Sequence, residues 1–128
     1  MSWQTILAIG SGGFIGAVSR AYINGLINRN VPHDLPFGTL GVNVLGSLIL
    51  GILFALFTYT EYFSTPMKSF LSTGMMGALT TYSTFALETF WLFNGGSLIL
   101  GIINILLNVT ATILAAGSGF KAIEYFLR

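Results

Sequence analysis

Four long apolar segments divide the chain, and they restrict its possible folds more than any other feature. They run from about Trp3 to Asn24, Phe37 to Tyr59, Met67 to Phe93 and Ser97 to Phe126. Each is close to or above the ~20 residues that a helix needs to cross the hydrocarbon core of a bilayer. The short links between them contain Pro or Gly, at which helices tend to stop. The sequence therefore predicts an all-α integral membrane protein, with four transmembrane helices in a single domain over residues 1–128.

Composition supports this class and excludes several others. Charged residues make up 7% of the chain and hydrophobic residues 54%, whereas soluble domains carry roughly 25% charged residues. A net charge of +1 gives no reason to expect a nucleic-acid partner. The chain has no Cys and a single histidine, His33, so neither a disulfide nor a Cys/His metal cluster is expected. No catalytic triad, carboxylate pair or phosphate loop can be assembled, so we do not expect an enzyme.

The third segment contains a stretch, Gly74–Phe85, that a plain membrane helix does not need. It carries Gly74 and Gly77 together with the hydroxyl residues at positions 80, 81, 83 and 84. Glycine loosens a helix, and Ser and Thr side chains compete for its backbone groups. In lipid, every freed N–H and C=O must find another partner. We therefore predict that the helix opens here, against protein, water or an ion.

Polar residues form a line on the second and fourth segments, at a spacing of four residues. The lines are Thr39, Asn43 and Ser47 on the second segment, and Asn104, Asn108 and Thr112 on the fourth. At this spacing the side chains share one face of a helix. Two interpretations stay open: hydrogen bonds that hold the helices together, or a path for water or a small ion.

Aromatic and acidic residues follow the stretch in the third segment. Tyr82 and Phe85 are neighbours on one helix face, a spacing more typical of packing than of a site. Glu88 lies about one turn further, and an intramembrane acid is a functional candidate. In the first segment, Gly12, Gly16 and Arg20 are four apart, and small residues at that spacing let helices approach closely. Arg20 is either a snorkelling anchor or a cation that attracts anions to a pore mouth.

Three motifs together resemble the Fluc (CrcB-type) fluoride channels over nearly the whole chain. They are Gly16-x-x-x-Arg20, Gly38-Thr39-Leu40-x-x-Asn43 and Gly77-x-x-Thr80-Thr81-Tyr82-Ser83-Thr84-Phe85. The resemblance implies an antiparallel, dual-topology homodimer with two pores and a broken third helix. It also implies a structural Na⁺ at the dimer centre, held by the backbone carbonyls of Gly77 and Thr80.

The resemblance also implies roles for particular side chains. The family's pore asparagine maps to Asn43, its aromatic pair to Tyr82 and Phe85, and its fourth-helix polar positions to Asn104, Asn108 and Thr112. The sequence departs from the family at Tyr82, where the family has Phe. With Arg20 at the pore mouth, the expected pore and fluoride-binding residues are Asn43, Tyr82, Phe85, Thr39, Ser47, Ser83, Asn108 and Thr112.

The implied activity is passive export of F⁻ across the bacterial inner membrane, which lowers fluoride toxicity in the cytoplasm. Hydroxyl and amide donors can replace the water around fluoride without a fixed charge that would trap it. Aromatic ring edges are positive and can face an anion. An alternative is a small proton-coupled multidrug transporter, but such proteins use a glutamate in the first helix, which this chain lacks. A third possibility is a membrane scaffold that transports nothing.

The positive charges predict little preference for one orientation. With four spans, Lys68, Lys121 and Arg128 lie on the side of the N-terminus, against Arg20 and Arg29 on the other side. Three charges against two is a weak positive-inside signal. We therefore predict that both orientations insert, as an antiparallel dimer requires.

Overall fold

A computed structural model describes all 128 residues, and it is helical throughout, without strands. In chain order the elements are α1 (Trp3–Asn30), α2 (Phe37–Tyr59), α3 (Thr65–Ser69), the π-helix η1 (Phe70–Met76), α4 (Gly77–Leu79), α5 (Tyr82–Asn94) and α6 (Leu98–Leu127). The all-α class predicted from the sequence is confirmed.

Helices α1, α2 and α6 are each long and apolar enough to cross a membrane. Their outer faces expose large apolar side chains, among them Phe14 (72% exposed), Ile99 (73%) and Ile113 (65%). Such a surface is costly in water and suits lipid. The chain is therefore a multi-pass membrane protein.

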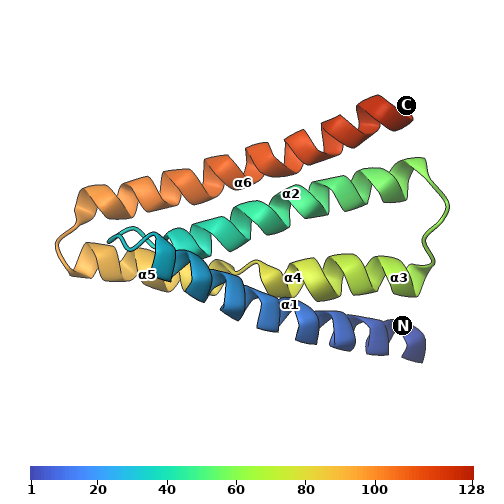
Figure 1. The fold of residues 1–128 in the computed structure, drawn as a ribbon, viewed down its shortest axis with the longest axis horizontal. Coiled ribbons are helices and arrows are strands. Elements are labelled where there is room, and N and C mark those ends of the chain that lie inside the picture. The colour runs from blue at the N-terminus through green and yellow to red at the C-terminus, as the bar shows by residue number, and fades with distance from the viewer.

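The third predicted segment is not one helix but a stack of shorter ones. Elements α3, η1 and α4 follow each other along one line, and α5 continues that line after a gap (Figure 1). In the gap, Thr80 and Thr81 are extended, with ψ of 155° and 120°. The opening predicted within Gly74–Phe85 is thus present, and it falls at Thr80–Thr81.

Helix α1 is longer than predicted, since it continues six residues past Asn24, to Asn30. Asn28 and Asn30, expected in a link, stay helical because their amides find acceptors one turn back. Asn28 Nδ2 donates to Asn24 Oδ1 at 2.8 Å, and Asn30 Nδ2 donates to the Leu26 carbonyl at 2.8 Å. Polar composition alone therefore placed this boundary too early.

Glycines set the closest helix contacts, as the spacing of Gly12 and Gly16 predicts. A Cβ on Gly12 would meet the Phe70 carbonyl, and one on Gly16 would meet the Met75 carbonyl. From the other side, a Cβ on Gly74 would lie 2.9 Å from the Ile9 carbonyl. Helix α1 and η1 therefore cross backbone against backbone, while α2 and α6 run side by side (Figure 1).

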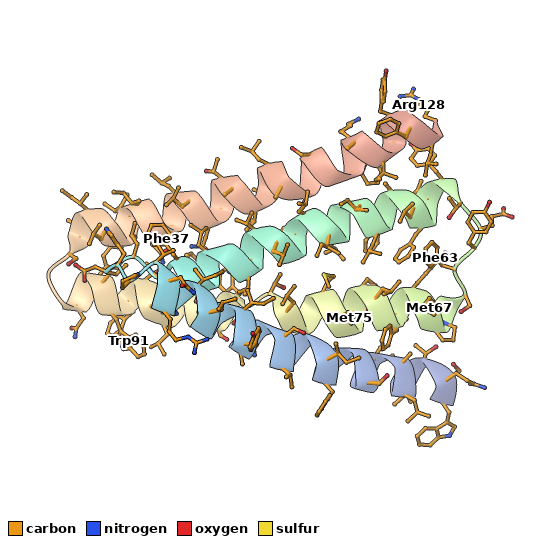
Figure 2. The ribbon with its side chains drawn as sticks, in the orientation of Figure 1. Phe37, Phe63, Met67, Met75, Trp91 and Arg128 are labelled. Atoms are coloured by element: carbon orange, nitrogen blue, oxygen red, sulfur yellow. The ribbon has the colours of Figure 1, made fainter.

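The helix ends gather at two opposite ends of the molecule. Both termini and the α2–α3 link lie at one end, and the α1–α2 and α5–α6 links lie at the other (Figure 1). Phe37 and Trp91 lie at the second end and Phe63 at the first (Figure 2). Aromatic side chains near both ends are typical of the two membrane interfaces.

Candidate functional site

A cavity of about 270 Å³ lies beside the Thr80–Thr81 gap, among α2, α5 and α6. Its lining mixes hydroxyls and amides with aromatic and aliphatic groups. The lining residues are Asn43, Ser47, Leu50, Thr80, Thr81, Tyr82, Phe85, Asn108, Val109 and Thr112.

Asn43 braces the gap by pairing with one peptide unit. The Thr81 N–H donates to Asn43 Oδ1 at 2.7 Å, and Asn43 Nδ2 donates to the Thr81 carbonyl at 3.1 Å. Asn43 is 8% exposed and Thr81 7%. An extended peptide buried in apolar surroundings needs such partners. A side chain on α2 thus supplies the hydrogen bonds that a continuous helix would have supplied itself.

The polar line of α6 extends this pairing into a buried chain of hydrogen bonds. Asn43 Nδ2 also donates to Asn108 Oδ1 at 3.1 Å, and Asn108 Nδ2 donates to Asn104 Oδ1 at 3.1 Å. Asn104 Nδ2 donates to Thr89 Oγ1 at 2.9 Å, and that hydroxyl donates to the Phe85 carbonyl at 2.7 Å. The chain therefore links α2, α6 and α5 around the cavity.

Asn43 has no amide hydrogen left for another acceptor. One hydrogen goes to Thr81 and the other to Asn108. The family resemblance implies that Asn43 lines the pore, where an amide would donate to the anion. In this arrangement, donation to an anion requires one of the two bonds to open first.

The aromatic pair begins α5, directly after the gap. The rings of Tyr82 and Phe85 lie edge to face, with centroids 5.4 Å apart and planes at 70°. Phe85 is 7% exposed, whereas Tyr82 is 79% exposed. Edge-to-face contact is the geometry that ring quadrupoles favour. Both rings line the cavity, Phe85 in the interior of the chain and Tyr82 at its surface.

Two backbone carbonyls lose their usual helical donors at the gap. A continuous helix would direct the Thr81 N–H to the Gly77 carbonyl and the Thr84 N–H to the Thr80 carbonyl. Here Asn43 takes the first N–H, and Thr81 Oγ1 takes the second at 3.3 Å. The Gly77 and Thr80 carbonyls are the two that the family resemblance implies as ligands of a structural Na⁺.

Most of the predicted pore residues lie together, and some do not. Asn43, Ser47, Tyr82, Phe85, Asn108 and Thr112 line the cavity, as does Thr80. Thr39, Ser83, Gly77 and Arg20 are not among its lining residues. Ser83 and Gly77 are exposed, and Arg20 is half-buried and outside both ion pairs of the chain.

Thr39 instead lies in a region shared with Glu88. Thr39 is 1% exposed, and neither its Oγ1 nor Glu88 Oε1 has a hydrogen-bond partner. Glu88 also lines a second cavity, of about 470 Å³, near the α1–α2 and α5–α6 links. His33 and Asp34 are among the other residues around it.

Sequence reasoning missed two residues that hold the site together. Thr81 was one hydroxyl among four, and nothing in the pattern indicated that its peptide would pair with Asn43. The sequence pattern gives no sign that Thr89 contributes, although it lies four residues after Phe85 and so shares its helix face. Its position opposite Asn104 depends on how α5 packs against α6.

Comparison with known proteins agrees with these features. The family model described as CrcB-like protein, Camphor Resistance (CrcB), matches residues 7–120. A protein of Sulfurimonas denitrificans named fluoride-specific ion channel FluC is 64% identical over 128 residues, covering 100% of this chain and 99% of its own. Proteins of the same name from Nautilia profundicola and Campylobacter jejuni are 53% and 45% identical, over 100% and 91% of this chain and 100% and 95% of their own. The chain therefore belongs to the CrcB-like family.

Proposed function

We propose that this protein is a fluoride-selective channel that lets F⁻ leave the cytoplasm passively and so limits its toxicity. The relatives named fluoride-specific ion channel support this proposal. The structural observation that carries it is the cavity at the interrupted segment, lined by hydroxyl, amide, aromatic and aliphatic side chains but by no charged one. Fluoride is a strong hydrogen-bond acceptor, so such donors can replace its hydration without trapping it.

The pore follows the polar lines of α2 and α6. Asn43, Ser47, Asn108 and Thr112 form its polar wall, and Tyr82 and Phe85 form its aromatic wall. Thr39 and Ser83 extend the polar wall beyond the cavity, and Arg20 acts at the mouth, where a cation raises the local anion concentration.

A second, antiparallel copy of the chain completes each of two pores. The gap lies between Gly77, which begins α4, and the first residues of α5, Tyr82 and Ser83. All three residues are exposed in a single chain. A membrane protein has little reason to present hydroxyls and freed carbonyls to lipid. A partner copy covering this face satisfies them.

A structural Na⁺ at the centre of that dimer suits the two freed carbonyls. Gly77 and Thr80 from both copies offer four neutral oxygens and no carboxylate, a set that favours a hard monovalent cation. The ion would hold the two interrupted segments together without being transported. Purified dimer should lose fluoride flux and thermal stability when Na⁺ is replaced by N-methylglucamine, and regain both when Na⁺ returns.

The deciding experiment is ion efflux from liposomes that contain the purified protein. Fluoride should leave quickly down its gradient, without a proton gradient, while chloride stays inside. The alternative, a proton-coupled multidrug transporter, predicts proton-dependent movement of organic cations and its loss in Glu88→Gln. Fluoride retention equal to that of empty liposomes would refute the channel. We place the channel in the bacterial inner membrane, where such export would protect the cytoplasm.

A further inference from the structure

We infer that Asn104 and Thr89 are positioning residues, which fix the side-chain amides of Asn43 and Asn108 at the cavity. This inference rests on the proposed channel function for its flux readout. Neither residue lines the cavity. Both are buried, Asn104 to 2% and Thr89 to 6% exposure.

From Asn43 to the Phe85 carbonyl, the hydrogen bonds of this network all donate in the same direction. Thr81 fixes the orientation of Asn43, because its N–H can bond only the amide oxygen and its carbonyl only the amide nitrogen. The orientation of Asn108 then follows, since its oxygen must accept from Asn43. Its nitrogen reaches both the carbonyl and the side-chain oxygen of Asn104, at 2.9 and 3.1 Å.

Thr89 binds the side-chain amide of Asn104, the last amide in the network. Asn104 must present its oxygen to Asn108, so its nitrogen faces Thr89 Oγ1 at 2.9 Å. That hydroxyl is able to accept because its own hydrogen is directed to the Phe85 carbonyl. Without that hydroxyl, Asn104 Nδ2 would be buried with no acceptor, so the bond from Asn108 to Asn104 would weaken and the Asn108 and Asn43 amides would be held less firmly at the cavity.

The arrangement decides which donors an anion meets. Both hydrogens of the Asn43 amide and both of the Asn108 amide are engaged. Thr80 directs its hydroxyl to the Met76 carbonyl of η1, and Thr112 directs its hydroxyl to the Asn108 carbonyl of α6. Ser47, on the wall formed by α2, keeps a hydroxyl that is not engaged in this way. Asn104 and Thr89 thus hold two strong donors away from the path and leave the Ser47 hydroxyl and the aromatic pair to meet the ion.

The test replaces Thr89 with a residue of the same shape that lacks the hydroxyl. In Thr89→Val we expect fluoride flux per assembled dimer to fall on the order of tenfold, as loss of an outer-shell partner does at metal sites. We also expect weaker exclusion of chloride, because a freed Asn108 amide can donate into the cavity. Thr89→Ser keeps the hydroxyl and should behave like the parent. Thr110→Val, on the exposed face of α6, is the matched control.

A second readout does not depend on transport. In protein labelled with ¹⁵N-asparagine, the side-chain signals of Asn43 and Asn108 should shift and exchange faster with D₂O in Thr89→Val, but not in Thr89→Ser or Thr110→Val. Asn104→Leu should give the same changes. If its effect on flux merely adds to that of Thr89→Val in the double variant, the two residues do not act through one chain.

The two readouts separate failure of this inference from failure of the proposed function. Absence of fluoride flux in the parent would refute the function, and the amide signals would still decide the positioning role. Parent-like flux, selectivity and amide signals in Thr89→Val would overturn the inference. So would an equal loss in Thr89→Ser, or lower flux with unchanged amide signals. Should Thr89→Val fail to assemble, Thr89→Ala serves the same comparison.

Discussion

At the scale of single residues, the Asn43 side chain replaces the backbone hydrogen bonds that a continuous helix would form at Thr81. The side-chain amide has the same donor and acceptor as a peptide unit, so it can pair with both groups of Thr81 at once. A serine or threonine has a single oxygen in place of the separate donor and acceptor atoms of the amide, so it lacks this peptide-like arrangement. The gap in the third segment therefore depends on a particular side chain of another helix.

Asn43→Asp is expected to reduce fluoride efflux to the background of empty liposomes. The substitution keeps the size but removes the donor, so that a carboxylate faces the Thr81 carbonyl and the side-chain oxygen of Asn108. Each buried acceptor left unpaired costs about 1–3 kcal/mol, and the negative charge repels the anion. Efflux per assembled dimer is the measurement, and Asn94→Asp, at the exposed end of α5, is the control. Normal conduction in Asn43→Asp would leave Asn43 as a structural residue only.

The two aromatic residues are expected to respond differently to substitution. Phe85 is buried and has only its ring edge to offer, so Phe85→Ile should greatly reduce fluoride flux while the chain still folds. Tyr82→Phe keeps the edge-to-face contact and should conduct at least as well as the parent. Liposome efflux of both variants decides the matter. The opposite pattern would make the tyrosine hydroxyl the working group and Phe85 a packing residue.

Spacing along the sequence was enough to find the polar faces but not their partners. The line of Asn104, Asn108 and Thr112 is visible as a repeat of four, and so is the line through Asn43. Which amide faces which carbonyl depends on the rotation and tilt of α2 and α6, and spacing does not carry that information. Thr39 shows the difference, because it shares the line of Asn43 yet does not line the cavity.

At the scale of secondary-structure elements, the crossing of α1 and η1 depends on the absence of side chains. Gly16→Ala is expected to destabilise the protein by about 1–3 kcal/mol, because the added Cβ meets the Met75 carbonyl and lies 3.0 Å from Ala78 Cβ. Gly10→Ala, in the same helix with nothing within 4 Å, should be neutral or slightly stabilising. Thermal unfolding in detergent compares the two. Equal midpoints would mean that the crossing can widen without cost.

The elements themselves were predicted well where apolar length decides them, and less well where local bonding does. All four apolar segments are helical, and the gap falls within the Gly- and Thr-rich stretch. The extension of α1 to Asn30 and the π-helical geometry of Phe70–Met76 were not predicted. Hydropathy does not distinguish a π-helix from an α-helix, since the same apolar residues can form either and the difference lies in which carbonyl each N–H reaches.

At the scale of the whole molecule, the few charges leave the orientation in the membrane nearly undetermined. Lys68 is in α3, Lys121 is near the end of α6 and Arg128 is the last residue, whereas Arg29 is in the last turn of α1. Figure 1 shows α3 and both termini at one end of the molecule and the α1–α2 link at the other. We expect both orientations in similar amounts. Because the chain has no cysteine, one introduced cysteine at Ser2 is a unique label. An impermeant thiol reagent should label about half of the molecules from each side of the membrane, and labelling from one side only would contradict the prediction.

The π-helix η1 is a segment from which one residue could be removed without changing how the flanking helices pack. A π-helix closes its hydrogen bonds over five residues instead of four, so seven residues in this geometry hold about one more than the adjoining α-helices need. Deleting Thr73, which is exposed, lets the run relax to α-helix with both flanks still facing their neighbours. Deleting Thr110 from the regular helix α6 instead turns everything beyond it by about 100°. Gel filtration should show that the dimer still assembles after the first deletion and does not after the second. Phe70–Met76 would then be the segment in which one residue can be lost without rotating the helices on either side.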